Sequence, residues 1–256
     1  MCLILFGYYA HPAYPLVLAA NRDEFYDRPT APAEFWPSTP GILGGRDLAA
    51  GGSWLAVNRQ GKLAAVTNFR DGRPQSASRS RGHLVREYLR STLSGEEQLQ
   101  CLEPVQNEYG GFNLLLLDPE GLYYASNRAQ QQAAVEPGIH GLSNHLLDTA
   151  WPKVETGKAR LREQLDHPRE QLIEGLFDVL ADRSQWHPEQ LPHTGVTPEW
   201  EKKLSAAFIQ TAGYGTRAST VIVLDREGHL DFVERSFDVS GQCTGQRQFR
   251  VMGFAR

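Results

Sequence analysis

Apolar residues along the chain fall into short runs separated by turns, which is the pattern of β-hairpins rather than of long helices. Four pairs of runs each predict a hairpin with two antiparallel strands. They are Met1–Tyr8 with Pro15–Ala20, Ser53–Asn58 with Lys62–Asn68, Phe112–Asp118 with Gly121–Asn127, and Ser219–Asp225 with His229–Phe237. A further run, Gln246–Phe254, predicts a final strand.

Helical periodicity lies between these hairpins. The spacing of apolar residues predicts helices over Arg81–Leu93, Lys153–Leu165 and Glu170–Leu180, with Ser80 as the N-cap of the first and Gly95 as its stop. Thr197 followed by Pro198 predicts the start of another helix. Hairpins outnumber crossovers, so we expect an α+β protein with largely antiparallel sheets and helices packed on them. No linker divides residues 1–256, which predicts one domain, and Ala181–Val196 is the longest expected loop.

The composition is that of an ordinary globular protein, with 256 residues, 41% hydrophobic and 22% charged. The net charge is −4, and no Lys and Arg cluster is dense enough to follow a nucleic-acid backbone. The arginines between Arg70 and Arg81 are interpreted as a solvated loop leading into a helix. We therefore expect no nucleic-acid partner. The oligomeric state stays open.

The three cysteines, Cys2, Cys101 and Cys243, are odd in number and widely spaced, which argues against a disulfide framework or a zinc site. A reducing, cytoplasmic location is the natural expectation. No apolar run approaches the roughly 20 residues that span a membrane. The first residues also lack the basic start of a signal peptide, and Pro12 and Pro15 interrupt them.

Cys2 is the most informative residue for chemistry. Removal of Met1 places a thiol and a free α-amine on one residue, and an α-amine with a pKa of roughly 7.7–8.0 can accept a proton near neutral pH. An N-terminal nucleophile paired with its own amine is an established catalytic arrangement. The alternative is structural, because Cys-Leu-Ile-Leu-Phe also has the composition of a core strand.

The polar run Asn21-Arg22-Asp23-Glu24 ends the first predicted hairpin. Antiparallel pairing brings this end beside Cys2, where Asp23 can hold the α-amine and Arg22 or Arg217 can favour a thiolate. The alternative is a solvated strand exit.

Glycines, asparagines and histidines carry weaker signals. The segments Gly44–Asp47 and Gly51–Trp54 lack the pattern of a phosphate loop. They are interpreted as turns, and a close approach of the backbone to a ligand is the alternative. Asn68 ends one strand and Asn144 follows another, so each is a candidate donor to an oxyanion or an ordinary turn former. The eight histidines show no metal-binding spacing, and no metal site is predicted.

Several motifs in order along the chain resemble the NRDE family, also called the transport and Golgi organisation protein 2 family. They are the start Met-Cys-Leu-Ile, Leu18-Ala-Ala-Asn-Arg-Asp-Glu-Phe25, Gly44-Gly-Arg-Asp47, Gly51-Gly-Ser-Trp-Leu55, Gly141-Leu-Ser-Asn144 and Tyr214-Gly-Thr-Arg217. That family is in turn similar to N-terminal nucleophile hydrolases of the penicillin V acylase and bile-salt hydrolase type. The resemblance implies a four-layer α-β-β-α sandwich.

The resemblance also implies roles for individual residues. Cys2 matches the catalytic cysteine and Asp23 the motif aspartate, while Asn68, Asn144 and Arg217 match two oxyanion asparagines and a later arginine. The hydrolase motif Arg-Asn-x-Asp has Ala20 in place of its arginine, and Arg22 lies two residues further on. On an extended strand these two positions share a face. Within the motifs we expect Asn21, Arg22, Arg46 and Trp54 to contact the substrate.

Two function hypotheses follow. In the first, Cys2 attacks a linear amide or thioester, its α-amine moves the proton, Asp23 orients the amine, and Asn68 and Asn144 stabilise the oxyanion without a required cofactor. In the second, the same cleft carries haem or an acyl-CoA without chemistry, as the family's links to haem trafficking and to acyl-CoA and lipid handling imply. A ligand-free interaction scaffold is a third, weaker alternative.

Overall fold

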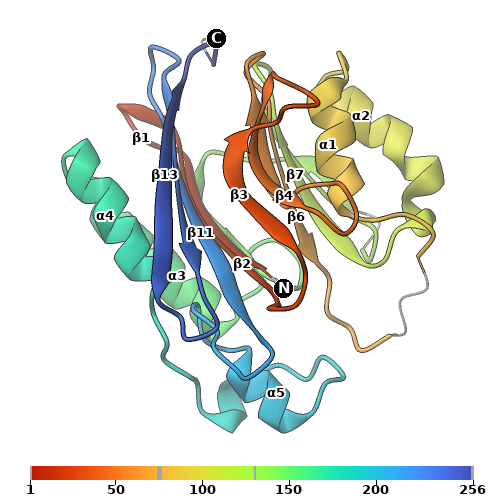
Figure 1. Ribbon diagram of the computed structural model, residues 1–256, viewed down its shortest axis with the longest axis vertical. Coiled ribbons are helices and arrows are strands. Elements are labelled where there is room, and N and C mark those ends of the chain that lie inside the picture. The colour runs from red at the N-terminus through yellow and green to blue at the C-terminus, as the bar shows by residue number, and fades with distance from the viewer. Residues whose placement is uncertain (1, 74–76, 130, 255–256) are drawn as a thin grey trace.

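The computed structural model describes residues 2–73, 77–129 and 131–254. Two antiparallel sheets face each other, and helices cover their outer faces, so the molecule has the layers α-β-β-α (Figure 1). The predicted α+β class and four-layer sandwich are therefore confirmed. The fate of Met1 lies outside the described residues.

The first sheet has six strands in the order β10-β1-β2-β11-β12-β13. β1 and β2 form its N-terminal hairpin, and β11 pairs with the other edge of β2. The strands are β1 (Cys2–His11), β2 (Tyr14–Phe25), β10 (Gly138–Leu142), β11 (Tyr214–Leu224), β12 (Leu230–Phe237) and β13 (Cys243–Val251).

The second sheet has seven strands that pair in chain order. It contains the predicted hairpins β5–β6 and β7–β8. Its strands are β3 (Thr30–Phe35), β4 (Ile42–Asp47), β5 (Leu55–Asn58), β6 (Leu63–Asn68), β7 (Phe112–Leu117), β8 (Leu122–Ser126) and β9 (Gln131–Ala134).

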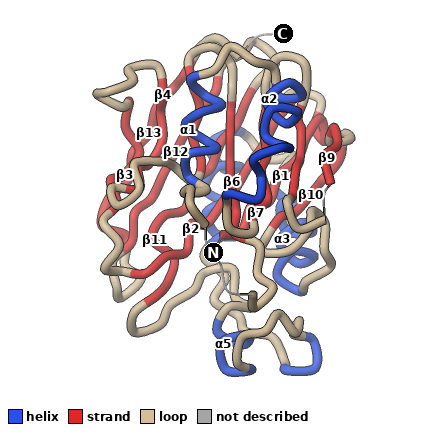
Figure 2. The backbone as a smooth tube through the Cα atoms, turned by 90° about the vertical axis from the view of Figure 1, so that its right-hand side faces the viewer, coloured by secondary structure: helices blue, strands red, loops and turns tan. Residues whose placement is uncertain are grey.

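Helices α1 and α2 cover the outer face of the second sheet, and α3 and α4 cover that of the first (Figures 1 and 2). The helix α5 lies at one end of the molecule, beyond the sandwich. The α-helices are α1 (Gly82–Arg90), α2 (Gly95–Leu102), α3 (Pro152–Gln164), α4 (Arg169–Leu180) and α5 (Pro198–Lys203). Short 3₁₀ helices span Glu103–Glu108 and Pro188–Gln190.

Three of the apolar clusters among the described residues follow from this layering. The central one packs the inner faces of the two sheets together through fully buried side chains such as Phe6, Leu43 and Phe232. The other two lie under the helices, where Leu176 of α4 and Tyr88 of α1 are fully buried. Alternate residues of each central strand thus bury in both directions, which explains why these strands read as continuous apolar runs.

Two sequence-based expectations are corrected by the fold. The second strand of the first hairpin is predicted to end at Ala20, but β2 continues to Phe25 between β1 and β11, so the run Asn21–Glu24 is not a solvated strand exit and lies beside Cys2. Gly44 and Gly45 were expected in turns but lie in β4. A Cβ on Gly44 would lie 2.6 Å from the Ala56 Cβ, and one on Gly45 would lie 2.2 Å from the Trp54 ring, so close packing explains both glycines.

The stop expected at Gly95 is also wrong, since Gly95 begins α2. Ser94 and Glu97 form a capping box there, in which each side chain binds the other residue's backbone N–H. No helix of the described residues is long and apolar enough to cross a membrane.

Candidate functional site

Cys2, at the start of β1, opens onto a cavity of about 260 Å³ between the two sheets. The Cα of Cys2 pairs with that of Arg22 on β2, so the hairpin places both residues and the following Asp23 at this cavity. The lining residues are Cys2, Arg22, Asp23, Glu24, Asp47, Ser53, Trp54, Val66, Asn68, Ala77, Arg79, Ser80, Arg81, Gly82 and Gly110. We call this space the Cys2 cavity.

Arg22 forms one wall of the Cys2 cavity. Its guanidinium lies 4.3 Å from the centre of the Trp54 ring and donates a hydrogen bond to Thr30 Oγ1 at 3.2 Å. The residue is only 5% exposed. A cation held over an aromatic face in a dry environment is stabilised by the ring quadrupole. Arg22 therefore keeps a fixed positive charge beside Cys2, at a position two residues from Ala20.

Asp23 is 2% exposed and is fixed from β11. Thr216 donates to Asp23 Oδ1 at 2.7 Å, and the Tyr214 hydroxyl donates to the Asp23 carbonyl at 3.0 Å. Burial raises the pKa of the Asp23 carboxyl, while the charge of Lys153 and the Thr216 hydrogen bond lower it. A buried carboxylate in this position is suited to hold a cationic amine next to Cys2.

Burial also dominates the electrostatics of the neighbouring groups. It raises the pKa of the Cys2 thiol, and the charge of Arg22 and a backbone hydrogen bond from Asp23 work in the opposite direction. Burial lowers the pKa of Lys153 to about 8, although the carboxylate of Asp23 favours its charged form. Lys153 Nζ donates to the Leu204 carbonyl at 2.8 Å. The thiol thus needs a local base to become a nucleophile.

The two candidate asparagines lie next to each other but differ in their access to the cavity. Asn68 lines the Cys2 cavity at the end of β6. Asn144 is fully buried, and its Nδ2 donates to the Asn68 carbonyl at 3.0 Å. Ser143, beside it, donates from Oγ to the Cys2 carbonyl at 3.2 Å. Asn144 therefore contacts the strand end that carries Asn68, while Asn68 faces the cavity.

Three other sequence-predicted residues lie away from the Cys2 cavity. Asn21 donates to the Leu180 and Ala207 carbonyls at 2.9 and 2.8 Å, so it ties β2 to the layer of α4. Arg217 Nη1 donates to carbonyls of the turn after β2, including that of Phe25 at 2.9 Å. Arg46 forms an ion pair with Glu34 at 2.7 Å and lines a different cavity.

The cavity is also lined by residues that no sequence pattern identified as site residues. Arg79, Ser80, Arg81 and Gly82 line it at the start of α1. Burial lowers the pKa of Arg81, and the charge of Cys2 favours its cationic form. The arginine-containing run before α1 was interpreted as a solvated loop, and no local pattern revealed that its end folds onto the N-terminal strand. The start of α1 and Arg81 add positive potential to the cavity.

A second cavity of about 500 Å³ adjoins the first, and Trp54 lines both. Glu234 of β12 lines this second cavity but is only 1% exposed. Its carboxyl accepts hydrogen bonds from the Ala33 backbone N–H at 2.6 Å and from Thr220 Oγ1 at 3.2 Å. Burial raises the pKa of Glu234 to about 7.

This carboxyl predicts a pH dependence of stability. Glu234 keeps its proton in the folded chain at pH values where the unfolded chain has lost it, so its contribution is fully present below the ordinary pKa of 4.5 and is lost as the pH rises to about 7. Glu234→Gln cannot ionise. Urea unfolding should show that the free energy of unfolding falls less with pH in this variant, by about 3 kcal/mol between roughly pH 5 and 8. An equal fall in both proteins contradicts the assignment.

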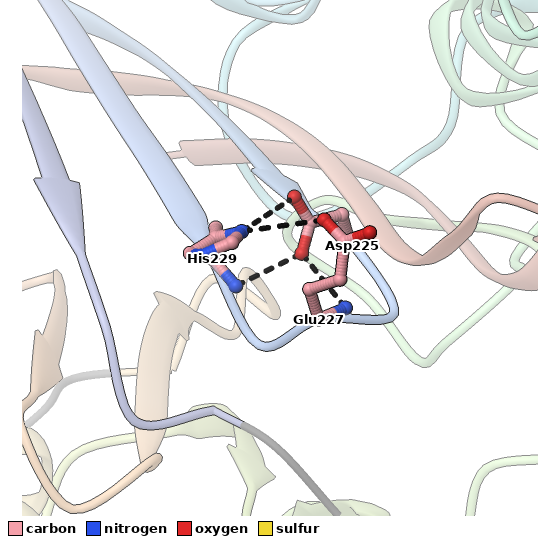
Figure 3. Close-up of side chains that lie close together, drawn as sticks. All are labelled: Asp225, Glu227 and His229. Carbon is pink, nitrogen blue, oxygen red and sulfur yellow. Dashed lines mark hydrogen bonds and ion pairs between the residues drawn. The ribbon is translucent and has the colours of Figure 1, made fainter.

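One set of side chains among the described residues has ligand atoms close enough to hold a metal ion, all within 4.8 Å of one another (Figure 3). It consists of Asp225, Glu227 and His229 on the turn between β11 and β12. Asp225 already accepts hydrogen bonds from Arg169 at 3.1 Å and from the His229 backbone N–H at 2.9 Å. The turn explains the cluster, and we assign no metal to it.

Comparison with known proteins gives a match over most of the chain. The family model described as transport and Golgi organisation 2 matches residues 1–239. The chain is 36% identical to the human transport and Golgi organization protein 2 homolog, over 92% of this chain and 93% of that protein. It is 28% identical to transport and Golgi organization protein 2 of Drosophila melanogaster, over 92% of each chain.

Among solved structures, similarity extends to two hydrolases. An N-acylethanolamine-hydrolyzing acid amidase ortholog from Caenorhabditis elegans aligns with a TM-score of 0.45 and 11% identity, covering 87% of this chain and 92% of that one. A variant of the conjugated bile acid hydrolase from Clostridium perfringens aligns with a TM-score of 0.47 and 9% identity, covering 100% of this chain and 98% of that one.

Proposed function

The chain belongs to the transport and Golgi organisation 2 family, and from that premise we propose that it is a hydrolase of linear amides or thioesters with Cys2 as its nucleophile. The observation that carries this proposal is the arrangement at the N-terminal hairpin. One cavity of about 260 Å³ brings together the thiol of Cys2, the carboxylate of Asp23 and the cation of Arg22. This volume is near the lower end of small-molecule sites, roughly 300–1,000 Å³, and suits a small acyl group.

The first step needs a free α-amine on Cys2. Removal of the residue that precedes Cys2 creates this amine, with a pKa near neutrality, and the Asp23 carboxylate holds it in place. The amine takes the thiol proton as the sulfur attacks the substrate carbonyl, which forms a tetrahedral intermediate. That proton then passes to the leaving amine or thiolate, and Cys2 becomes acylated. Water attacks the acyl group in the second half, with the same amine as base, and frees the thiol.

Charge stabilisation is the task of the cavity wall. The side-chain amide of Asn68 can donate to the oxyanion from the end of β6, where it faces the cavity. Arg22 and Arg81 place positive charges in the wall of the cavity, and such charges favour both the thiolate and the oxyanion. The Trp54 ring packs against the Arg22 guanidinium and offers an apolar surface to the acyl group.

Asn68 and Asn144 form a matched pair for testing this role. Asn68→Ala should lower kcat about 10²- to 10³-fold because it removes an oxyanion donor. It should change the melting temperature little, since the Asn68 contact with Asn144 uses its backbone carbonyl. Steady-state hydrolysis of an acyl thioester measures the first effect.

Asn144→Ala should have the opposite profile. It leaves a carbonyl at a buried strand end without its donor, which should lower the free energy of unfolding by about 1–3 kcal/mol in a urea titration. The opposite result would be a loss of activity with unchanged stability in Asn144→Ala, together with full activity in Asn68→Ala. It would make Asn144 the oxyanion donor and contradict that role for Asn68.

A carrier function for haem or an acyl-CoA is the second candidate. The observation that favours it is that burial raises the pKa of the Cys2 thiol. If no α-amine is formed on Cys2, the thiol therefore stays protonated and unreactive. Ligand binding that survives Cys2→Ala, followed as a Soret shift for haem or by calorimetry for an acyl-CoA, would support the carrier. Covalent acylation of Cys2 followed by turnover would support the hydrolase.

A further inference from the structure

An arginine-lined cavity of about 280 Å³ lies between α1 and the loops on either side of β4. Its basic residues are Arg46, Arg86 and Arg90, and we call it the arginine cavity. It borders the Cys2 cavity, since Asp47 lines both, but neither Cys2 nor Asp23 lines it. The complete lining is Trp36, Ser38, Thr39, Arg46, Asp47, Leu48, Gly51, Arg86 and Arg90.

Three arginines line this space from two different elements. Arg86 and Arg90 are one turn apart on α1, so they share a helix face with their Cβ atoms about 5–6 Å apart. Arg46 comes from β4. Like charges on neighbouring positions repel each other. Their convergence concentrates positive charge at one cavity, which favours the binding of an anion there.

Neighbouring groups hold two of these arginines while leaving donors unused. Arg46 Nη2 donates to Glu34 Oε1 at 2.7 Å, and Arg86 Nη1 donates to the Gly51 carbonyl at 3.0 Å. Arg46 Nη1 and Arg86 Nη2 have no hydrogen-bond partner among the described residues. An oxyanion in the cavity can accept hydrogen bonds from both of them.

The acidic residue of the lining does not neutralise this charge. Asp47 forms an ion pair with Arg28 at 2.7 Å and accepts a hydrogen bond from the Ala49 backbone N–H at 3.0 Å. Its carboxylate is therefore occupied outside the cavity. The hydroxyl groups of Ser38 and Thr39 complete the lining with further donors.

We propose that the arginine cavity binds a phosphate group, either as a free inorganic anion or as the phosphate ester of a small molecule. Guanidinium groups present planar pairs of N–H donors that match phosphate oxygens. The cavity volume leaves room beyond one phosphate for a second phosphate or a small organic group. This site is independent of the chemistry proposed for Cys2.

Calorimetric titration of the full chain with phosphate, pyrophosphate and phenyl phosphate tests this site. At least one probe should bind the parent protein, and rising salt should weaken binding. Arg86→Gln and Arg90→Gln should each weaken it about ten- to a hundredfold, the loss of one charge-assisted hydrogen bond. The matched control is Arg226→Gln, which removes the same charge from an exposed turn on the other sheet and should leave binding unchanged.

The two cavity variants protect the test against misfolding. Arg90 is exposed and its loss should not disturb the fold, whereas Arg86 also donates to the Gly51 carbonyl, so melting temperatures are recorded for both.

Tighter binding of phosphate or pyrophosphate indicates a free anion, and tighter binding of phenyl phosphate indicates an ester. Absence of binding for all three probes, or equal weakening by Arg226→Gln, overturns the proposal. Cys2 acylation in Arg90→Gln should match the parent.

Discussion

Cys2→Ala should abolish covalent acylation of the protein and lower hydrolysis of an acyl thioester by about 10³-fold or more, because it removes the attacking atom. The substitution should leave the fold unchanged. Cys2 is the first residue of β1 and its backbone pairing with Arg22 does not depend on the thiol. Mass spectrometry after incubation with the acyl donor measures adduct formation, and steady-state kinetics measures turnover.

The other cysteines provide the control. Cys101 and Cys243 are both exposed, and neither lines the Cys2 cavity. Cys101→Ala and Cys243→Ala should therefore be acylated and turn over like the parent. Slow turnover that is the same in the parent and in Cys2→Ala would rule out Cys2 as the nucleophile and leave the carrier function as the better account.

Asp23→Asn should cause the second large loss, about 10³- to 10⁴-fold in kcat, the scale seen when an orienting aspartate of a catalytic triad becomes an amide. The variant keeps the side-chain shape and an oxygen that can accept the 2.7 Å hydrogen bond from Thr216. It removes the negative charge that holds the α-ammonium group. The loss should appear in the rate of acylation, measured in a single turnover.

A positioning role for Asp23 also predicts a change in pH dependence. Without its carboxylate the α-amine should titrate at a lower pH, because a nearby negative charge favours the charged form of an amine. The acidic limb of the kcat/KM profile should therefore move to lower pH in Asp23→Asn. Asp166→Asn, at an exposed carboxylate far from the cavity, should keep the parent profile. An unchanged rate and profile in Asp23→Asn would contradict the role.

Local patterns predicted the regular elements because each is encoded within a few residues. The four hairpins and the final strand are all present, as are the helices α1, α3, α4 and α5. The N-cap role implied by Thr197 before Pro198 is also present, as Thr197 accepts a hydrogen bond from the Trp200 backbone N–H. The missed strands β3 and β4 contain Pro32 and the pair Gly44 and Gly45, which obscure a strand pattern. The two glycines pack against Ala56 and Trp54, a contact that their own run of sequence does not reveal.

The site was predictable from the sequence only where its residues lie on neighbouring strands of one hairpin. Hairpin pairing places Cys2 beside Arg22 and Asp23, and that juxtaposition follows from the first residues alone. Arg81 reaches the same cavity through the packing of α1, which no local pattern encodes. Arg217 lines the second cavity rather than the Cys2 cavity, and its guanidinium donates to the carbonyls of Phe25 and Tyr26 at the end of β2. The direction of the Arg217 side chain depends on tertiary contacts with residues far away in the sequence, which its local sequence does not encode.

The role of the Cys2 α-amine is tested first by the intact mass of the untagged protein purified from its own type of cell. The hydrolase mechanism requires a mature chain that begins with Cys2, since only then does the thiol have an α-amine beside it and Asp23 to hold that amine. A mass that shows a residue still attached before Cys2 would contradict the hydrolase mechanism, because the proposed base would not exist.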